Sequence, residues 1–148
     1  YLNLVRLGVE ESDISTILMA DYGLDLYGNA IIVNTEFAQK NQALVQGFLK
    51  AVAAGWKDAI ADPAVAIESL MKRNPAADPA LEQRRLQLAI DANVVTEYTL
   101  ENGMGGISAD RMARALQQMS TTYEFSSPPV PSLYFDSAFL PADGFSLK

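Results

Sequence analysis

The stretch ISTILMADYGLDLYGNAIIV, residues 14–33, decides the fold class, because it holds two apolar runs separated by turn-forming residues. Residues 14–20 begin with β-branched side chains, and residues 30–33 are apolar without interruption, which is typical of short buried strands. Between them, residues 21–29 carry the Asp, Gly and Asn side chains that favour turns. The pattern therefore predicts two buried strands, one at 14–20 and one at 30–33.

Helical periodicity follows from residue 36 onward. Over residues 36–61 apolar side chains recur every four positions, which predicts a long amphipathic helix with a break near Gly55. Asp-Pro pairs at 62–63 and 78–79 each supply an N-cap followed by Pro at the first helical position. Ser108 is the expected cap of a fourth helix. The inward positions of the long helix are expected to be Leu44, Phe48, Val52, Trp56 and Ile60, in a stripe widened by Val45, Leu49, Ala53 and Ala59.

The two ends of the chain have different characters. Residues 1–8 begin inside an apolar helical pattern, and Gly8 and Asn34 are expected to end one helix and to cap another. The last 24 residues are rich in proline, which predicts an irregular tail that must be tied down on a larger body. The side chains expected to pack from this tail are Phe125, Tyr134, Phe135, Phe139 and Leu140.

Composition removes several functional classes. The net charge of −7 disfavours nucleic acid and anionic lipid surfaces as partners. The sequence has no histidine and no cysteine, so Ser-His and Cys-His catalysis and the common zinc sites are excluded. We therefore expect binding and not catalysis, with no metal and no cofactor.

Several motifs, in order along nearly the whole chain, carry a family resemblance. The chain resembles the nitrate/sulfonate/taurine and thiamine-pyrimidine-precursor group of periplasmic binding proteins. These proteins serve ABC importers and have the type II periplasmic-binding-protein fold. The motifs are ADYGLDLYGNAIIVN at 20–34, LVQGFLKA at 44–51, GWKDA at 55–59, DPAVA at 62–66, NP at 74–75 and FLP at 139–141.

The resemblance implies an α/β fold, of which this chain is the C-terminal portion, helix-rich with two or more short strands. Members of the group have two lobes joined by two hinge crossings and are about twice this length. Residues 1–20 would then end the second lobe, residues 21–29 would form a hinge crossing, and residues 30–148 would return to the first lobe. We name residues 21–29 the crossing segment. On this reading the chain is a truncated fragment that self-associates, since it would expose strand edges and apolar patches.

The crossing segment is the expected ligand site, because hinge crossings border the cleft of a two-lobed binder. Tyrosine rings can sandwich a flat ligand, and Asp and Asn side chains can read its hydrogen-bonding edge. An alternative stays open, in which these tyrosines are ordinary packing groups and the polar residues only form turns. The candidate ligand-binding residues are Asp21, Tyr22, Asp25, Tyr27 and Asn29.

The local charge bears on the ligand class. Residues 13–34 contain no Lys or Arg, whereas a small anion such as nitrate or a sulfonate requires cations or well-aimed amides. This favours a neutral or cationic aromatic heterocycle as the ligand.

The resemblance implies capture of a small organic solute and its delivery to an ABC permease and its ATPase, with the protein in the periplasm after removal of a signal peptide. Two alternatives remain. One is an enzyme like the pyrimidine-precursor synthases related to this family, which use a histidine and a pyridoxal cofactor. The other is a helical interaction module formed by residues 36–120.

Overall fold

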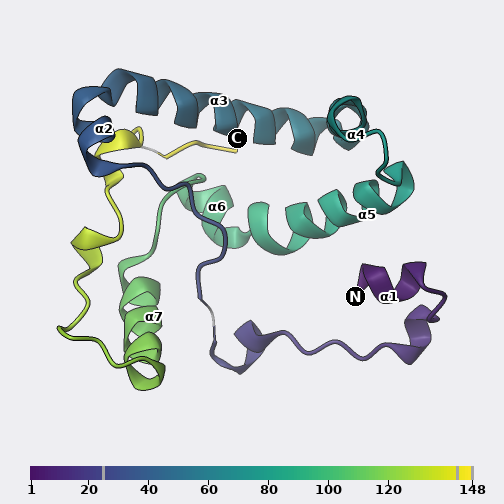
Figure 1. Cartoon of the computed structure of the whole chain (residues 1–148), viewed down its shortest axis with the longest axis horizontal. Helices are drawn as coiled ribbons and strands as arrows, with labels where there is room; N and C mark the ends of the chain where they lie inside the picture. The colour runs from purple at the N-terminus through teal and green to yellow at the C-terminus, as the bar shows by residue number, and fades with distance from the viewer. Residues whose placement is uncertain (25, 143, 148) are drawn as a thin grey trace.

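The computed structural model describes residues 1–24, 26–142 and 144–147, and helices dominate it (Figure 1). Between and after the α-helices, the described residues form five short turns of 3-10 or π type. The α-helices are α1 (Leu2–Arg6), α2 (Thr35–Lys40), α3 (Gln42–Ala61), α4 (Pro63–Arg73), α5 (Pro79–Ala89), α6 (Glu97–Asn102) and α7 (Ala109–Thr122). The shorter turns are η1 (Glu11–Asp13), η2 (Met19–Tyr22), η3 (Ile90–Val94), η4 (Pro131–Leu133) and η5 (Ser137–Phe139).

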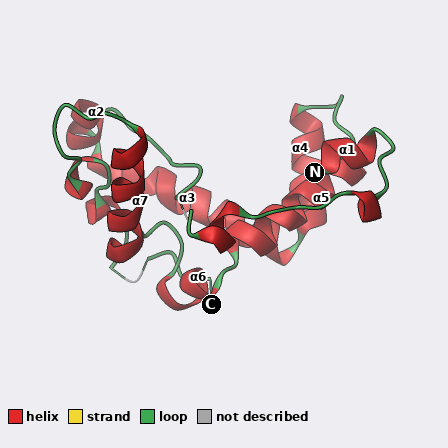
Figure 2. Cartoon of the chain, turned by 90° about the horizontal axis from the view of Figure 1, so that it is seen from below, coloured by secondary structure: helices red, strands yellow, loops and turns green. Residues whose placement is uncertain are grey.

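The helices form an open arrangement and not a closed bundle. Helix α4 packs against both α3 and α5, and α1 lies beside α5. Turn η5 contacts α3, and η4 contacts α7, so the C-terminal tail links two separate helices. Figure 2 shows one group of helices around α2 and α7 and another around α4, α5 and α1, joined along α3 and α5.

The predicted α/β fold is wrong. Among the described residues no strand forms, and the β-pairing there is a single isolated bridge between Met104 and Phe145. The segments expected as strands are solvent-exposed instead, with 67% of Ile17 and 93% of Ile32 accessible. A β-branched, apolar sequence shows only that a segment can pair and be buried. A strand also needs a neighbour, and among the described residues neither segment has a backbone hydrogen bond to a distant part of the chain.

The predicted helix starts are confirmed. The side chains of Asn34, Asp62, Asp78 and Ser108 accept hydrogen bonds from backbone N–H groups of the following first turn, at 3.0–3.4 Å. Each bond satisfies a donor that has no partner within the helix. Gly8, with φ at +91°, follows the end of α1, also as predicted.

The long helix breaks earlier than predicted. Helix α2 ends at Lys40, and α3 begins at Gln42 and continues past Gly55 without interruption. Asn41 causes the break, since its amide nitrogen donates to the carbonyl of Phe37 at 3.0 Å and its backbone leaves the helical region. A short polar side chain that bonds to nearby backbone competes with the helix in this way.

The buried face of α3 agrees with the predicted apolar stripe in part. Leu44 and Phe48, expected inside, are 61% and 55% exposed, whereas Val45 and Ala53 are buried. The remaining predicted inward positions, Val52, Trp56 and Ile60, are half-buried. Helix α3 packs against α4 and η5 through the side of the stripe that holds Val45 and Ala53, which leaves Leu44 and Phe48 on its outer edge.

The C-terminal tail is irregular, as predicted, and is tied to the loop after α6. Met104 and Phe145 exchange two backbone hydrogen bonds, at 2.9 and 3.3 Å. The expected packing from the tail is found only in part, because Phe135, Phe139 and Leu140 are half-buried while Phe125 and Tyr134 are exposed.

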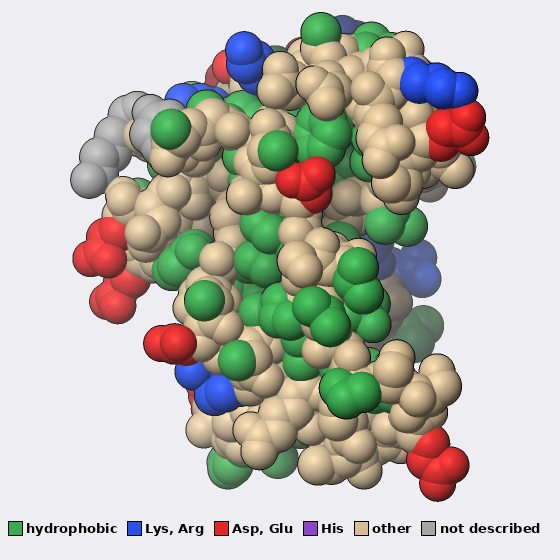
Figure 3. All heavy atoms as spheres, turned by 90° about the vertical axis from the view of Figure 1, so that its left-hand side faces the viewer, with side chains coloured by type: hydrophobic (Ala, Val, Ile, Leu, Met, Phe, Trp, Pro, Cys, Tyr) green, Lys and Arg blue, Asp and Glu red, His purple; other side chains and the backbone are tan. Residues whose placement is uncertain are grey.

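The hydrophobic core is thin. No described side chain of a large residue is fully buried. The chain exposes 11,080 Å², whereas the scaling of surface with mass gives about 7,400 Å² for a compact monomer of this size. Figure 3 shows apolar side chains open to solvent across the middle of one face. The buried apolar residues are Leu2, Ala38, Val45, Ala53, Ile67, Ile90 and Ala115.

Candidate ligand site at the crossing segment

Helix α7 holds the crossing segment through two long polar side chains. Arg111 donates a hydrogen bond to the backbone carbonyl of Leu26 at 2.9 Å, and Gln118 donates to the carbonyl of Gly23 at 2.6 Å. The guanidinium carbon of Arg111 also lies 4.2 Å from the centroid of the Tyr27 ring, a cation–π contact. These contacts hold Gly23, Leu26 and Tyr27 of the crossing segment against one face of α7.

Tyr27 is the predicted site residue that the fold engages most closely. Its hydroxyl oxygen accepts a hydrogen bond from the backbone N–H of Ser108, the N-cap of α7, at 2.7 Å. With Arg111 over the ring, both the polar and the aromatic parts of this half-buried side chain have partners. Tyr27 is therefore placed as an anchor between the crossing segment and α7.

The other predicted site residues remain on the surface. Asp21 lies in η2 and is exposed, Tyr22 is 78% exposed, and Asn29 is exposed. Within the described part of the chain, no hydrogen bond involves the side chains of these three residues. Asp25 lies outside the described residues. The structure therefore brings Tyr27 against α7 and leaves Asp21, Tyr22 and Asn29 accessible to a ligand.

Sequence reasoning missed the contribution of α7. Arg111, Ala115 and Gln118 are spaced four and three residues apart, so they share one face of the helix. Ala115 is buried at the centre of that face, with the two polar side chains reaching out on either side of it. This pattern, a small apolar residue between two long hydrogen-bond donors on one helix face, is the sequence feature that could have indicated that this face packs against a backbone segment.

Arg111 changes the electrostatic argument for the ligand. The crossing segment itself has no cation, but α7 places a guanidinium beside it. Arginine presents five N–H donors, which can serve an anion as well as a carbonyl. The charge of the crossing segment alone therefore does not distinguish a heterocycle from a small anion.

One polar atom beside the crossing segment lacks a partner. The Oε1 atom of Gln118 is buried without a hydrogen bond to any described residue, while its Nε2 atom serves Gly23. An unsatisfied buried acceptor costs about 1–3 kcal/mol. The hydrogen bond from Gln118 to Gly23 therefore offsets only part of the free-energy cost of burying the Gln118 amide.

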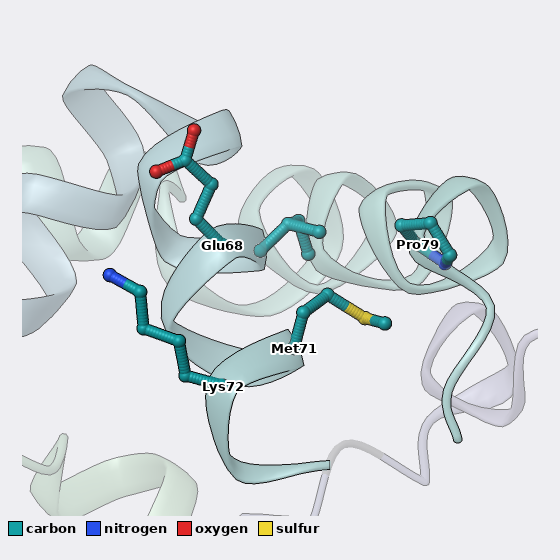
Figure 4. Close-up of a pocket in the computed structure, with 5 residues that line it drawn as sticks. Glu68, Met71, Lys72 and Pro79 are labelled. Carbon is teal, nitrogen blue, oxygen red and sulfur yellow. The ribbon is translucent and has the colours of Figure 1, made fainter. Parts of the chain in front are cut away.

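Two hollows lie away from the crossing segment. The larger, of about 480 Å³, lies between α4 and α5 (Figure 4). Met71 points toward the helix that carries Pro79, while Glu68 and Lys72 point away from it. The smaller, of about 280 Å³, is lined by residues of α1 and α5 and by Tyr1. No described residue of the crossing segment lines either hollow.

A cluster of polar side chains fastens the N-terminal residues to α5. Glu11 accepts hydrogen bonds from the hydroxyl of Tyr1 and from Arg84, the latter at 2.7 Å, and Arg85 donates to Asn3 at 2.5 Å. The hydrogen bond from Tyr1, and then that from Arg84, hold the pKa of Glu11 below its ordinary value. The same bond to Glu11 raises the pKa of Tyr1.

The lowered pKa of Glu11 gives a prediction with a definite sign. Because the folded pKa lies below the ordinary value of 4.5, the stabilising contribution is present above that pH. It is lost as the pH falls through the folded pKa. An NMR titration of the Glu11 carboxyl carbon should therefore show an inflection below 4.5.

Two variants test the causes of this shift. Tyr1→Phe and Arg84→Gln should each move the inflection toward the ordinary value, because Tyr1 lowers the pKa of Glu11 through its hydrogen bond and Arg84 through both a hydrogen bond and its charge. An inflection at or above 4.5 in the unaltered protein would show that the cluster does not form.

No described helix combines the length and the apolar character needed to cross a membrane. Searches of curated protein sequences and of solved structures found no match. A family model described as NMT1/THI5 like matches residues 1–66, which include the crossing segment, α2 and α3 but not α7. This match supports the family resemblance for that part of the chain and fits a solute-binding role in general terms. Over residues 1–66 the chain is similar to the NMT1/THI5-like family.

Proposed function

We propose that this chain is part of the substrate-binding component of an ABC-type importer and that it captures a small organic solute without transforming it. The observation that carries the proposal is the state of the crossing segment within the matched region. Its backbone is held by Arg111 and Gln118 of α7, while Tyr22 and Asn29 stay exposed. A backbone held in place at Gly23 and Leu26, with accessible polar and aromatic side chains, suits a ligand-contacting segment.

The proposed roles follow from the chemistry of each side chain. Tyr22 offers an aromatic face for stacking, Asn29 offers an amide donor and acceptor, and Asp21 offers a carboxylate. Tyr27 acts indirectly, because its hydroxyl and ring are engaged by α7. We favour an aromatic heterocycle as ligand, since the ring of Tyr22 is exposed and free to stack on one.

In this proposal the ligand lies in a cleft between two lobes, and closure about the hinge favours the ligand-bound form that meets the permease. The contacts between α7 and the crossing segment would make these two elements move together. The division into residues 1–20, 21–29 and 30–148 stays a prediction. The site of action is extracytoplasmic, with the permease and its ATPase as partners.

A thermal-shift screen tests this function. The sample is the polypeptide encoded by the complete reading frame that contains this chain, and the ligands are pyrimidines, flavins, taurine, alkanesulfonates and nitrate. A ligand at a hundred times its Kd should stabilise the protein by about 2.7 kcal/mol. Tyr22→Ala should abolish the shift, because it removes the stacking face.

Tyr134→Ala is the matched control, since Tyr134 is a second exposed tyrosine, 61% accessible, in the C-terminal tail. It should leave the shift unchanged. The 148-residue chain by itself should give no shift, because it would supply only part of the cleft. If no ligand of these classes stabilises the protein, the result would count against solute binding. An equal shift in the 148-residue chain would refute the claim that this chain supplies only part of the cleft.

A further inference from the structure

The loop between α6 and α7, residues 103–107, is rich in glycine. It begins with the sequence Gly-Met-Gly-Gly, and Gly103 and Gly105 adopt positive φ values of +77° and +89°. Glycine reaches such values at low steric cost, but it also has the most conformational freedom to lose on folding. The position of this loop therefore depends on contacts with other parts of the chain.

The end of the C-terminal tail supplies such contacts. Met104 and Phe145 exchange backbone hydrogen bonds at 2.9 and 3.3 Å. A Cβ atom at Gly105 would lie 3.2 Å from Cδ2 of Leu140 and 3.6 Å from Cδ2 of Phe145, so both side chains pack directly on the glycine backbone. The same tail is anchored on α3 through η5. The tail therefore limits the conformations that are open to the loop.

The other end of the loop carries the anchor of the crossing segment. Ser108 directly follows the loop, and its backbone N–H donates to the hydroxyl of Tyr27 at 2.7 Å. The Ser108 side chain also caps α7, because its hydroxyl accepts from the backbone N–H of Arg111 at 3.4 Å. A shift of the loop at Met104 would therefore move both the start of α7 and the donor that holds Tyr27.

We propose that the described residues of the tail from 137 to 147, which we name the strap, control the crossing segment through this loop. With the strap docked on Met104 and Gly105, Ser108 is positioned to hold Tyr27, and release of the strap weakens that hold. Docking rests on half-buried side chains and a short backbone pair, which is typical of segments that open locally. Control of ligand binding by the strap rests on the proposed function, whereas the coupling itself needs no ligand.

Amide hydrogen exchange of Ser108, measured by NMR without ligand in the polypeptide encoded by the complete reading frame, tests the proposal. Phe145→Ala removes a side chain that packs on Gly105. It should speed the exchange of Ser108 by about threefold to tenfold, the effect of losing one net hydrogen bond. In a Tyr27→Phe background the same substitution should add no further acceleration, because the acceptor is already gone. The amide of Ala53, inside α3, should exchange at its unaltered rate.

Phe125→Ala is the matched control. Phe125 lies in the same tail, is 42% exposed and has its described ring contact with Tyr123. This variant should leave the exchange of Ser108 unchanged. An unchanged rate at Ser108 in Phe145→Ala would overturn the proposal. So would an equal acceleration at Ala53, which would show general unfolding, or an equal effect of Phe125→Ala.

This experiment separates the strap from the proposed function. The predicted exchange pattern together with a silent thermal-shift screen would support the strap and count against solute binding. A positive screen with an unchanged Ser108 rate in Phe145→Ala would support solute binding and overturn the strap.

Discussion

Replacing Gly144 with alanine is expected to lower the free energy of unfolding by roughly 2–4 kcal/mol, which combines the cost of a left-handed backbone with that of overpacking. Gly144 has φ at +64°, and a Cβ atom there would lie 2.6 Å from the backbone carbonyl oxygen of Asn102. The carbonyl belongs to the end of α6 and cannot yield as a flexible side chain can. The strain falls next to Phe145, whose bridge to Met104 ties down the tail.

Urea denaturation at matched protein concentration measures this loss. Gly55→Ala is the control, because Gly55 lies inside α3 with nothing within 4 Å of the added methyl group. Alanine there should stabilise the chain by about 1 kcal/mol through helix propensity alone. If Gly144→Ala were as stable as the unaltered chain, the tail would not be docked on the loop after α6 as described.

Replacing Arg111 with methionine is expected to cost about 2–3 kcal/mol, from a charge-assisted hydrogen bond and a cation–π contact. Methionine keeps much of the aliphatic stem but loses the donor to Leu26 and the cation over Tyr27. Chemical denaturation measures the total. A double-mutant cycle with Tyr27→Leu should return a coupling of about 0.5–1 kcal/mol for the ring contact.

Arg73→Met is the control for this experiment, since Arg73 is an exposed residue at the end of α4 with no described hydrogen bond or ion pair. A surface substitution of this kind should change stability by no more than about 0.5 kcal/mol. Equal effects of Arg111→Met and Arg73→Met would mean that α7 does not hold the crossing segment.

Local signals in the sequence predicted local structure well. Asp62 and Asp78 cap their helices as expected, because an N-cap and a following proline act within one helical turn. The break at Asn41 depends on an equally local hydrogen bond to Phe37, but the break was predicted near Gly55 instead. Glycine lowers helix propensity without requiring a break.

Structure that depends on distant partners could not be predicted in the same way. Residues 30–33 have the composition of a buried strand, yet a strand exists only where another segment lies beside it. The predicted ligand-site residues all lie in one segment of the sequence. The contact of that segment with Arg111, 85 residues away from Leu26, depends on the tertiary fold and could not be predicted from local sequence. Composition predicts that these residues are buried or in contact with other groups, but only the fold shows which groups those are.

The central claim is that a solute binds at the crossing segment where α7 holds it. Hydrogen exchange of the polypeptide encoded by the complete reading frame, measured with and without a ligand from the thermal-shift screen, tests this most directly. We predict slower exchange in residues 21–29 and in α7 when the ligand is bound. Protection confined to the hollow between α4 and α5, with no change at the crossing segment, would contradict the claim.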